Sequence, residues 1–197
     1  MTPAGRPVRP SAAEIDEAVL DVAAGLVARR GVRDTSVQAV ADATGYSKTG
    51  LLGRFPAKDV LVAAALDQCV RLTEAVTAQV GLVSDGVERD AAAVTGLVDL
   101  ALRRPGWAQV VLASVPQVTD EALRPTLGVI GELVFGAFRV DERTDLERRA
   151  RVTGALGAMV VLALTHDQGA TAAVARPLVV ATCWDALGHR DPVPTTR

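Results

Sequence analysis

Residues 35–55, T-S-V-Q-A-V-A-D-A-T-G-Y-S-K-T-G-L-L-G-R-F, constrain the fold more than any other part of the chain. Thr35 or Ser36 can cap a helix in which apolar residues recur at spacings of three and four. Gly45 follows at a point where a helix can end in the left-handed conformation, which glycine adopts at least cost. Ser47 can then cap a second helix. The pattern therefore predicts two helices joined by a sharp, short turn.

The second helix, from Lys48 to Arg54, is too short to be stable alone, so neighbouring helices must hold it in place. Leu51 and Phe55 are four residues apart and are predicted to face inward. The outer side then carries donors and small residues that suit a groove of DNA, namely Lys48, Thr49, Gly50 and Arg54. We interpret this stretch as a helix-turn-helix; the alternative is an ordinary helical hairpin inside a larger all-helical core.

From about Ser11 to Leu61, the chain resembles the N-terminal domain of the TetR (tetracycline-repressor) family of transcriptional regulators. Residues 19–31, V-L-D-V-A-A-G-L-V-A-R-R-G, are similar to the first helix of that family. Residues 55–61 carry its F-x-x-K-x-x-L entry into a fourth helix. The resemblance implies a homodimer that binds a double-stranded DNA operator, most often as a repressor, and responds to a small-molecule effector.

The predicted DNA contacts divide into two kinds. Lys48, Thr49 and Gly50 are expected at base edges, whereas hydroxyls, charges and helix N-termini are expected at phosphates. The full predicted set is Thr35, Ser36, Ser47, Lys48, Thr49, Gly50, Arg54 and Lys58. Leu52 and Gly53 stand where the family usually has a tyrosine and a polar residue that touch phosphate. This departure favours an alternative, a TetR-like ligand-binding or adaptor protein with lost or weakened DNA binding.

Charge is distributed unevenly along the chain, although the formal net charge is only −2. Residues 29–58 hold six basic and two acidic residues, whereas residues 61–197 hold 13 basic and 16 acidic residues. Contacts with phosphate are therefore expected only near the N-terminal end. Hydrophobic residues make up 49% but aromatic residues only 3% of the chain, so Ala, Val and Leu must build the interior. This composition favours an all-α fold.

We predict about nine helices in two domains. The domain boundaries are a flexible arm over 1–10, a helix-turn-helix domain over 11–57, a helical effector-binding and dimerisation domain over 58–188 and a disordered tail over 189–197. Outside the helix-turn-helix, caps, prolines and apolar periodicity predict helices over about 11–31, 58–81, 87–104, 107–114, 119–138 and 145–165, and from a start between 171 and 177 to about 188. The apolar second half of the helix over 145–165 is expected to be buried on all sides.

The C-terminal domain offers two further candidate sites. An effector that is largely apolar is expected in a cavity lined by aromatic, soft and polar residues, namely Gln68, Trp107, Phe135, Phe138, Met159 and His166. Small residues on the helix over 145–165 permit close helix packing, and the resemblance implies that the last two helices pair with a second copy. The predicted interface is Gly154, Gly157, Val161, Leu178 and Trp184; packing within one chain is the alternative.

An enzyme is a third reading that the sequence disfavours. The chain has only two histidines and no metalloprotease, nucleophile-elbow or nucleotide-binding motif, so neither catalytic residues nor cofactor nor metal ligands are predicted. Cys69 and Cys183 lack metal-like spacing and are interpreted as reduced core thiols. The longest apolar run, residues 152–165, is too short to cross a bilayer, and the N-terminus has no signal peptide. We therefore expect a cytoplasmic protein without a membrane partner.

Overall fold

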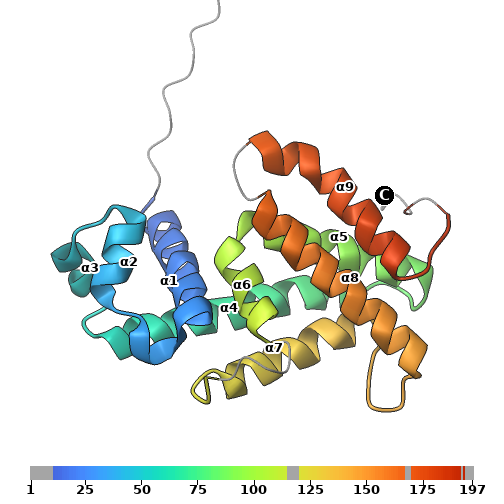
Figure 1. Cartoon of the computed structure of the whole chain (residues 1–197), viewed down its shortest axis with the longest axis horizontal. Coiled ribbons are helices and arrows are strands. Elements are labelled where there is room, and N and C mark those ends of the chain that lie inside the picture. Colours follow the sequence, from blue (N-terminus) through green and yellow to red (C-terminus); the bar gives the residue numbers. More distant parts are fainter. Residues whose placement is uncertain (1–10, 115–119, 167–169, 192, 194–197) are drawn as a thin grey trace, which may run out of the picture.

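The computed structural model describes residues 11–114, 120–166, 170–191 and 193. These residues form nine α-helices and no strand, which confirms the predicted all-α fold. The helices are α1 (Ala12–Asp34), α2 (Val37–Thr44), α3 (Lys48–Arg54), α4 (Lys58–Gly81), α5 (Val87–Arg103), α6 (Pro105–Ala113), α7 (Arg124–Ala137), α8 (Leu146–Thr165) and α9 (Ala170–Ala186). Figure 1 shows α1, α2 and α3 at one end and α4 running from them behind α6 and above α7 in this view. The predicted arm, residues 1–10, lies outside the described part.

The first helix begins with the predicted capping box and ends later than predicted. The Ser11 amide donates to Glu14 Oε2 at 2.7 Å, and the Glu14 amide donates to Ser11 Oγ at 3.2 Å. Gly31 does not end α1 but interrupts it with a φ of +82°, and the helix continues to Asp34. The amide of Val32 there donates to Asp120 Oδ2 at 2.6 Å. A contact from a distant part of the chain therefore supports the last turn.

Prolines mark the beginnings of α6 and α7. Pro105 lies in the first turn of α6, which therefore starts two residues before the predicted Trp107. Pro125 lies in the first turn of α7, which starts at Arg124 and not near the predicted Thr119, a residue outside the described part. In α9, Pro177 lies inside the helix, which starts at Ala170, one residue before the predicted window. Burial of Val179 and Cys183 favours the helix despite the backbone hydrogen bond that proline removes.

Helices α1 and α6 approach so closely that only glycine fits between them. A Cβ placed on Gly106 would lie 1.8 Å from the backbone oxygen of Asp21. The Asp21 carboxylate, 7% exposed, accepts the amides of Gly106 at 3.0 Å and Trp107 at 3.1 Å, and so caps α6. Burial raises the pKa of this carboxyl, and the two hydrogen bonds oppose that rise. The Trp107 indole then donates to Thr73 Oγ1 of α4 at 2.8 Å. One polar network therefore joins α1, α6 and α4.

The end of α9 is tied to the N-terminal half of α5. His189 Nε2 lies 2.9 Å from Asp90 Oδ2, and its ring stacks on Trp184 with centroids 3.9 Å apart. Arg148 of α8 donates to both oxygens of Asp90, at 2.9 and 2.6 Å. His189, which the sequence places in a disordered tail, is therefore packed against α5 and α9. Of the rest of that tail, residues 192 and 194–197 lie outside the described residues.

No described helix is both long and apolar enough to cross a lipid bilayer.

Candidate functional site

The helix-turn-helix has the predicted caps. Ser36 Oγ accepts the amide of Ala39 at 3.1 Å and so caps α2. Gly45 ends α2 with φ +72° and ψ 12°, the left-handed conformation that its sequence position predicts. Ser47 Oγ then accepts the amide of Gly50 at 3.0 Å and caps α3. These local hydrogen bonds fix the corner between α2 and α3.

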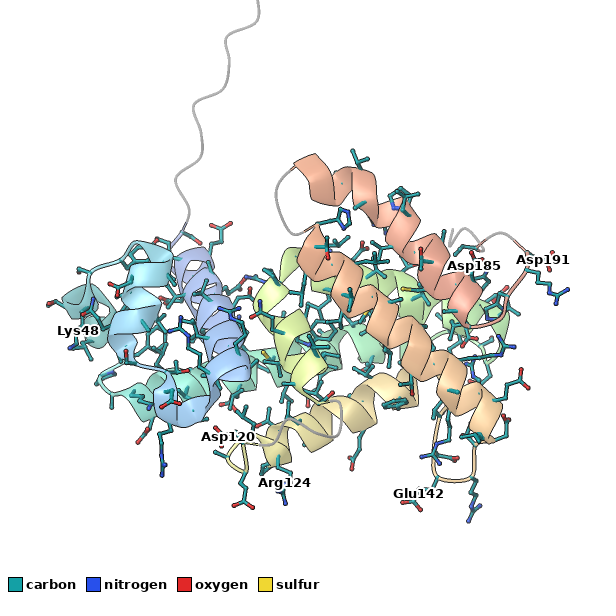
Figure 2. All side chains as sticks on the ribbon, in the orientation of Figure 1. Lys48, Asp120, Arg124, Glu142, Asp185 and Asp191 are labelled. Carbon is teal, nitrogen blue, oxygen red and sulfur yellow. The ribbon has the colours of Figure 1, made fainter. Side chains whose placement is uncertain are left out.

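Helix α3 buries one side and exposes the other. Leu51 is 1% exposed and Phe55 is 9% exposed, which confirms the predicted inward face. Lys48, Thr49 and Gly50 are all exposed on the opposite side. Figure 2 shows Lys48 at the outer end of the N-terminal domain, far from the helices of the C-terminal domain. A short helix held by its neighbours thus presents an ammonium, a hydroxyl and a glycine to the surroundings.

The structure divides the predicted phosphate-binding residues into accessible and internal ones. Thr35 is only 2% exposed, and its hydroxyl donates to the Gly31 carbonyl at 2.8 Å. Arg54 is exposed, but its guanidinium pairs with Asp16 and donates to the Ala12 carbonyl at 3.2 Å. Thr35 and Arg54 therefore already have partners within the N-terminal domain, and a contact with phosphate would compete with these partners. Burial removes the Thr35 hydroxyl from the surface, and residues in the N-terminal part of α1 occupy the Arg54 guanidinium.

Ser36, Ser47 and Lys58 stay available at the same surface. Both serines are exposed caps, and Lys58 Nζ donates to the Arg33 carbonyl at 2.8 Å. An ammonium has three donors, so this bond leaves donors free for a phosphate. Exposed Arg30 and Arg33 lie at the end of α1 beside it and were not among the predicted contacts. Their place in a segment of net charge +4 is the signal that points to them.

Leu52 and Tyr46 lie near the corner between α2 and α3. Leu52 is half-buried and packs against the core, so α3 offers an apolar side chain at this position. Tyr46, the only tyrosine of the chain, is 42% exposed in the turn before α3. Sequence reasoning passed over Tyr46, although a large aromatic residue between Gly45 and Ser47 has little room to be buried in so short a turn.

The N-terminal domain matches a known family. Residues 19–65 match the family model described as "Bacterial regulatory proteins, tetR family". This match spans α1 from Val19, the whole helix-turn-helix and the start of α4, and it coincides with the capped corner and exposed α3 described above. Over these residues the N-terminal domain is therefore similar to the helix-turn-helix domain of bacterial TetR-type regulators. No curated protein matches its sequence.

Solved structures of TetR-like proteins share the fold of this protein over nearly the whole chain. A TetR-like transcriptional regulator from Rhodococcus sp. RHA1 aligns with a TM-score of 0.53 and 19% identity, covering 92% of this chain and 100% of that one. A putative TetR-family transcriptional regulator from Rhodococcus sp. aligns with a TM-score of 0.51 and 18% identity, covering 88% of this chain and 99% of that one. At this identity the likeness establishes the fold alone.

The residues predicted for the effector pocket do not line one cavity in this structure. Trp107 is fully buried between α6 and α4, and Gln68 is buried with its amide donating to the Glu17 carbonyl at 3.0 Å. Phe138 and Met159 share an apolar cavity of only about 10 Å³. Phe135 lies at a separate surface hollow, and His166 follows the last turn of α8. These residues lie on different helix faces, which periodicity alone does not reveal, so they do not form one site in this structure.

The largest of the described hollows lies elsewhere, between α4 and α5. Its volume is about 580 Å³. Apolar side chains of both helices form most of its lining, and three polar residues complete it: Leu72, Ala75, Val76, Val80, Leu82, Val83, Ala92, Gly96 and Leu100, with Gln79, Asp99 and Arg103. The sequence alone did not identify this groove, because the apolar positions of α4 also fit an ordinary packed helix.

The predicted dimer residues are mostly exposed on α8 and α9. Val161 is 54% exposed and Leu178 is 67% exposed, both high for large apolar side chains. A Cβ added to Gly154 or Gly157 would meet no atom within 4 Å. Trp184 differs, because it is 3% exposed, and its indole donates to the Asp191 carbonyl at 2.6 Å, so it lies inside the protomer. The exposure of Val161 also shows that the second half of α8 is not buried on all sides, contrary to the prediction.

Both cysteines are buried and free, which agrees with core thiols. Burial raises the pKa of Cys69 and of Cys183 to about 12. Among the residues that the structure describes, no group of three or more His, Cys, Asp or Glu side chains is placed to hold a metal ion.

Proposed function

We propose that this TetR-family regulator is a non-enzymatic, cytoplasmic repressor that acts as a homodimer and leaves its operator when a small molecule binds. The observation that carries this proposal is the exposed side of α3, where Lys48, Thr49 and Gly50 project beyond a rigidly capped corner. A helix of this size fits the major groove, in which donor and acceptor patterns distinguish all base pairs. Lys48 supplies the charged donor for guanine or for a thymine oxygen.

The contacts with phosphate are assigned to side chains that remain accessible beside α3. Ser36 and Ser47 bring hydroxyls and helix N-termini to one edge, and Lys58 brings an ammonium with unused donors. Arg30 and Arg33 extend this edge along the end of α1. Such contacts set the register of the protein on DNA without reading sequence, and they make its affinity depend on salt.

The homodimer is assigned to the exposed apolar face of α8 and α9. Val161, Val174 and Leu178 are 54%, 71% and 67% exposed, and glycines at 154 and 157 leave room for a close neighbour. Large apolar side chains exposed to this extent are costly in water and favour association. A two-fold axis through this face would place two copies of α3 on one side, with half-site centres about 34–36 Å apart or a multiple of that distance.

Helix α4 is the proposed link between effector and DNA. It is 24 residues long, or about 36 Å at 1.5 Å per residue, and carries Lys58 at one end while packing on α5 and α7 at the other. A ligand that binds one orientation of α4 better than the other changes the separation of the two α3 helices and thereby the affinity for DNA.

A second function is favoured by one specific observation, the small number of free phosphate contacts. Leu52 is apolar, Thr35 is buried and the Arg54 guanidinium is paired with Asp16. A ligand-binding protein with weakened DNA affinity would have these features. Its DNA affinity would then be low for every sequence, with no preferred site.

Selection of bound fragments from random DNA, followed by footprinting, separates the two functions. A repressor should select a two-fold symmetric site. Lys58→Ala should weaken binding to all sequences alike and lower the slope of log affinity against log salt by about one. Lys48→Ala should relax discrimination at one or two base pairs, at a cost of roughly 1–3 kcal/mol.

The matched control is Arg143→Ala, which removes the same charge from an exposed residue beside Glu142, at the opposite end of the molecule from Lys48 in Figure 2. Unchanged affinity, salt slope and base preference in both lysine variants on a selected site would show that α3 is not the reading helix. Failure to select any site would favour the ligand-binding alternative.

A further inference from the structure

The groove between α4 and α5 has the dimensions of a binding site for a long molecule. Its lining runs along α4 from Leu72 to Leu82, which is about 15 Å at 1.5 Å per residue. Its volume of about 580 Å³ lies within the range of roughly 300–1,000 Å³ that ligand pockets occupy. At its floor the helices nearly touch, because a Cβ on Gly96 would lie 2.9 Å from Val76 Cγ1. Glycine at this position therefore keeps the groove deep.

The groove is apolar along its length and charged at one end. Leu82, at the far end, is 81% exposed, the kind of side chain that a bound apolar molecule would cover. At the other end, Asp99 accepts two hydrogen bonds from the Arg176 guanidinium of α9, at 2.5 and 2.9 Å. This pairing neutralises the carboxylate. Arg103 is exposed, and it forms no ion pair with any residue that the structure describes.

The local charge therefore selects the sign of a ligand. Arg103 and Arg176 contribute two positive charges against the single negative charge of Asp99, which leaves one positive charge beside an apolar channel. A carboxylate, sulfate or phosphate head group at Arg103 would be complemented, whereas an ammonium there would be repelled. The opposite end offers no charge for a second ionic group, since Gln79, Val80, Leu82 and Val83 line it.

We propose that this groove is the effector site and that its ligand is an elongated, apolar molecule with one anionic head group. The head group binds Arg103, and the apolar chain lies between α4 and α5 toward Leu82. The regulatory part of this proposal rests on the proposed function: a chain inserted beside Val76 would move α4 relative to α5, and α4 carries Lys58 to the DNA surface.

The other hollows of the C-terminal domain lack this combination. The hollow at the start of α5 is lined by Arg89, Asp90 and Arg148, but these charges already satisfy one another and nearby carbonyls. The hollow beside Phe135 is lined by three acidic residues and one basic residue, so its charge would repel an anionic head group. Only the α4–α5 groove joins a long apolar lining to an unbalanced charge among the hollows described.

Isothermal titration calorimetry of the full chain tests the site without DNA. The probes are dodecanoate, dodecanol and dodecyltrimethylammonium, each below its micelle concentration. Dodecanoate should bind most tightly. Arg103→Gln should weaken dodecanoate by about fivefold, the upper end for an exposed ion pair, and leave dodecanol unchanged. Arg103→Glu should reverse the preference between dodecanoate and dodecyltrimethylammonium. Arg143→Gln, which removes a charge far from the groove, should change nothing.

Filling the groove tests its position. Ala75 is exposed and lines the groove, so Ala75→Phe should weaken dodecanoate and dodecanol alike, by about tenfold or more. Ala63→Phe is the matched control, since Ala63 is an exposed alanine of the same helix more than two turns away from the lining. Circular dichroism of each variant confirms that the fold is retained. Equal effects of the two phenylalanines, or tighter binding of the cationic probe by the unmodified chain, would overturn the site.

A final measurement separates this proposal from the proposed function. Dodecanoate should lower the affinity of the unmodified protein for its selected operator, and it should have no effect on the Ala75→Phe variant. Binding with the predicted charge preference but without any change in operator affinity would overturn the effector role of the groove. If the protein selects no operator, the proposed function fails, whereas calorimetry still decides whether the groove binds an apolar anion.

Discussion

Replacing Asp21 tests how α1 and α6 are joined. Its carboxylate is the acceptor for two buried backbone amides, those of Gly106 and Trp107. Asp21→Ala leaves both donors unsatisfied at the N-terminus of α6, and each unsatisfied buried donor costs about 1–3 kcal/mol. Removing a buried charge offsets part of this cost, because burial already disfavours the ionised form. We expect a net loss of about 2–4 kcal/mol in the free energy of unfolding.

Asp21→Asn isolates the charge from the hydrogen bonds. The amide oxygen of asparagine can still accept from the start of α6, so the loss should be smaller, about 1 kcal/mol. Urea unfolding at pH 7, followed by circular dichroism, measures both variants. Asp67→Asn is the control, because it removes one carboxylate from an exposed position on α4. A change within about 0.5 kcal/mol for Asp21→Ala, as is usual for surface substitutions, would refute the reasoning.

The raised pKa of Asp21 also predicts how the free energy of unfolding changes with pH. Burial, the largest cause, raises the pKa of folded Asp21 above its unfolded value of 3.8. Between those two pKa values the folded protein binds more protons than the unfolded chain, so its stability rises as the pH falls through this window. The unmodified protein should therefore gain stability relative to Asp21→Asn on acidification toward pH 3.8, and a relative loss would contradict the raised pKa.

Four further outcomes are expected. Gly157→Leu should convert a dimer into a monomer in sedimentation, because the added side chain obstructs close helix approach, and a stable monomer of the unmodified protein would contradict the interface. Trp107→Ala should cost about 3–5 kcal/mol of unfolding free energy, as for a core aromatic, and a change in ligand response alone would show that it is not core. Cys69 and Cys183 should react with a thiol reagent only upon unfolding, because their pKa values of about 12 keep the thiolate scarce, so fast labelling of the folded chain would disprove their burial. Tyr46→Phe should weaken binding to all DNA sequences by about twofold to fivefold if its hydroxyl touches phosphate, and unchanged affinity would exclude that contact.

Features fixed by neighbouring residues were predictable from sequence. The capping box at Ser11, the caps at Ser36 and Ser47 and the end of α2 at Gly45 each depend on residues within four positions. The bounds of α3 agree with the prediction for the same reason. The inward face of α3 followed from the spacing of four residues between Leu51 and Phe55, which places both on one side of the helix.

Features fixed by distant contacts were not predictable in this way. The last turn of α1 forms beyond Gly31 because Asp120 reaches it from the other domain. The sequence predicted that Arg54 contacts DNA, but its guanidinium forms an ion pair with Asp16. Trp107 and Phe135 were predicted to line a pocket because they are aromatic. Trp107 of α6 is instead buried in the core, and Phe135 of α7 lies at a separate hollow. Burial of a side chain depends on which helix lies opposite, and periodicity does not contain that information.

The fit between α1 and α6 bears on how this protein can be divided for experiments. The predicted domain boundary follows residue 57, but α1 packs against the C-terminal half through Asp21, Gly106 and the ion pair of Glu17 with Arg104. In a fragment ending at residue 57, the apolar surface of α1 would be exposed to water, and the Asp21 carboxylate would lose its two amide donors. Such a fragment should be largely unfolded and a poor substitute for the whole chain in crystallisation with DNA. Designs that graft this reader onto another scaffold would have to carry α6, with its glycine, along with it.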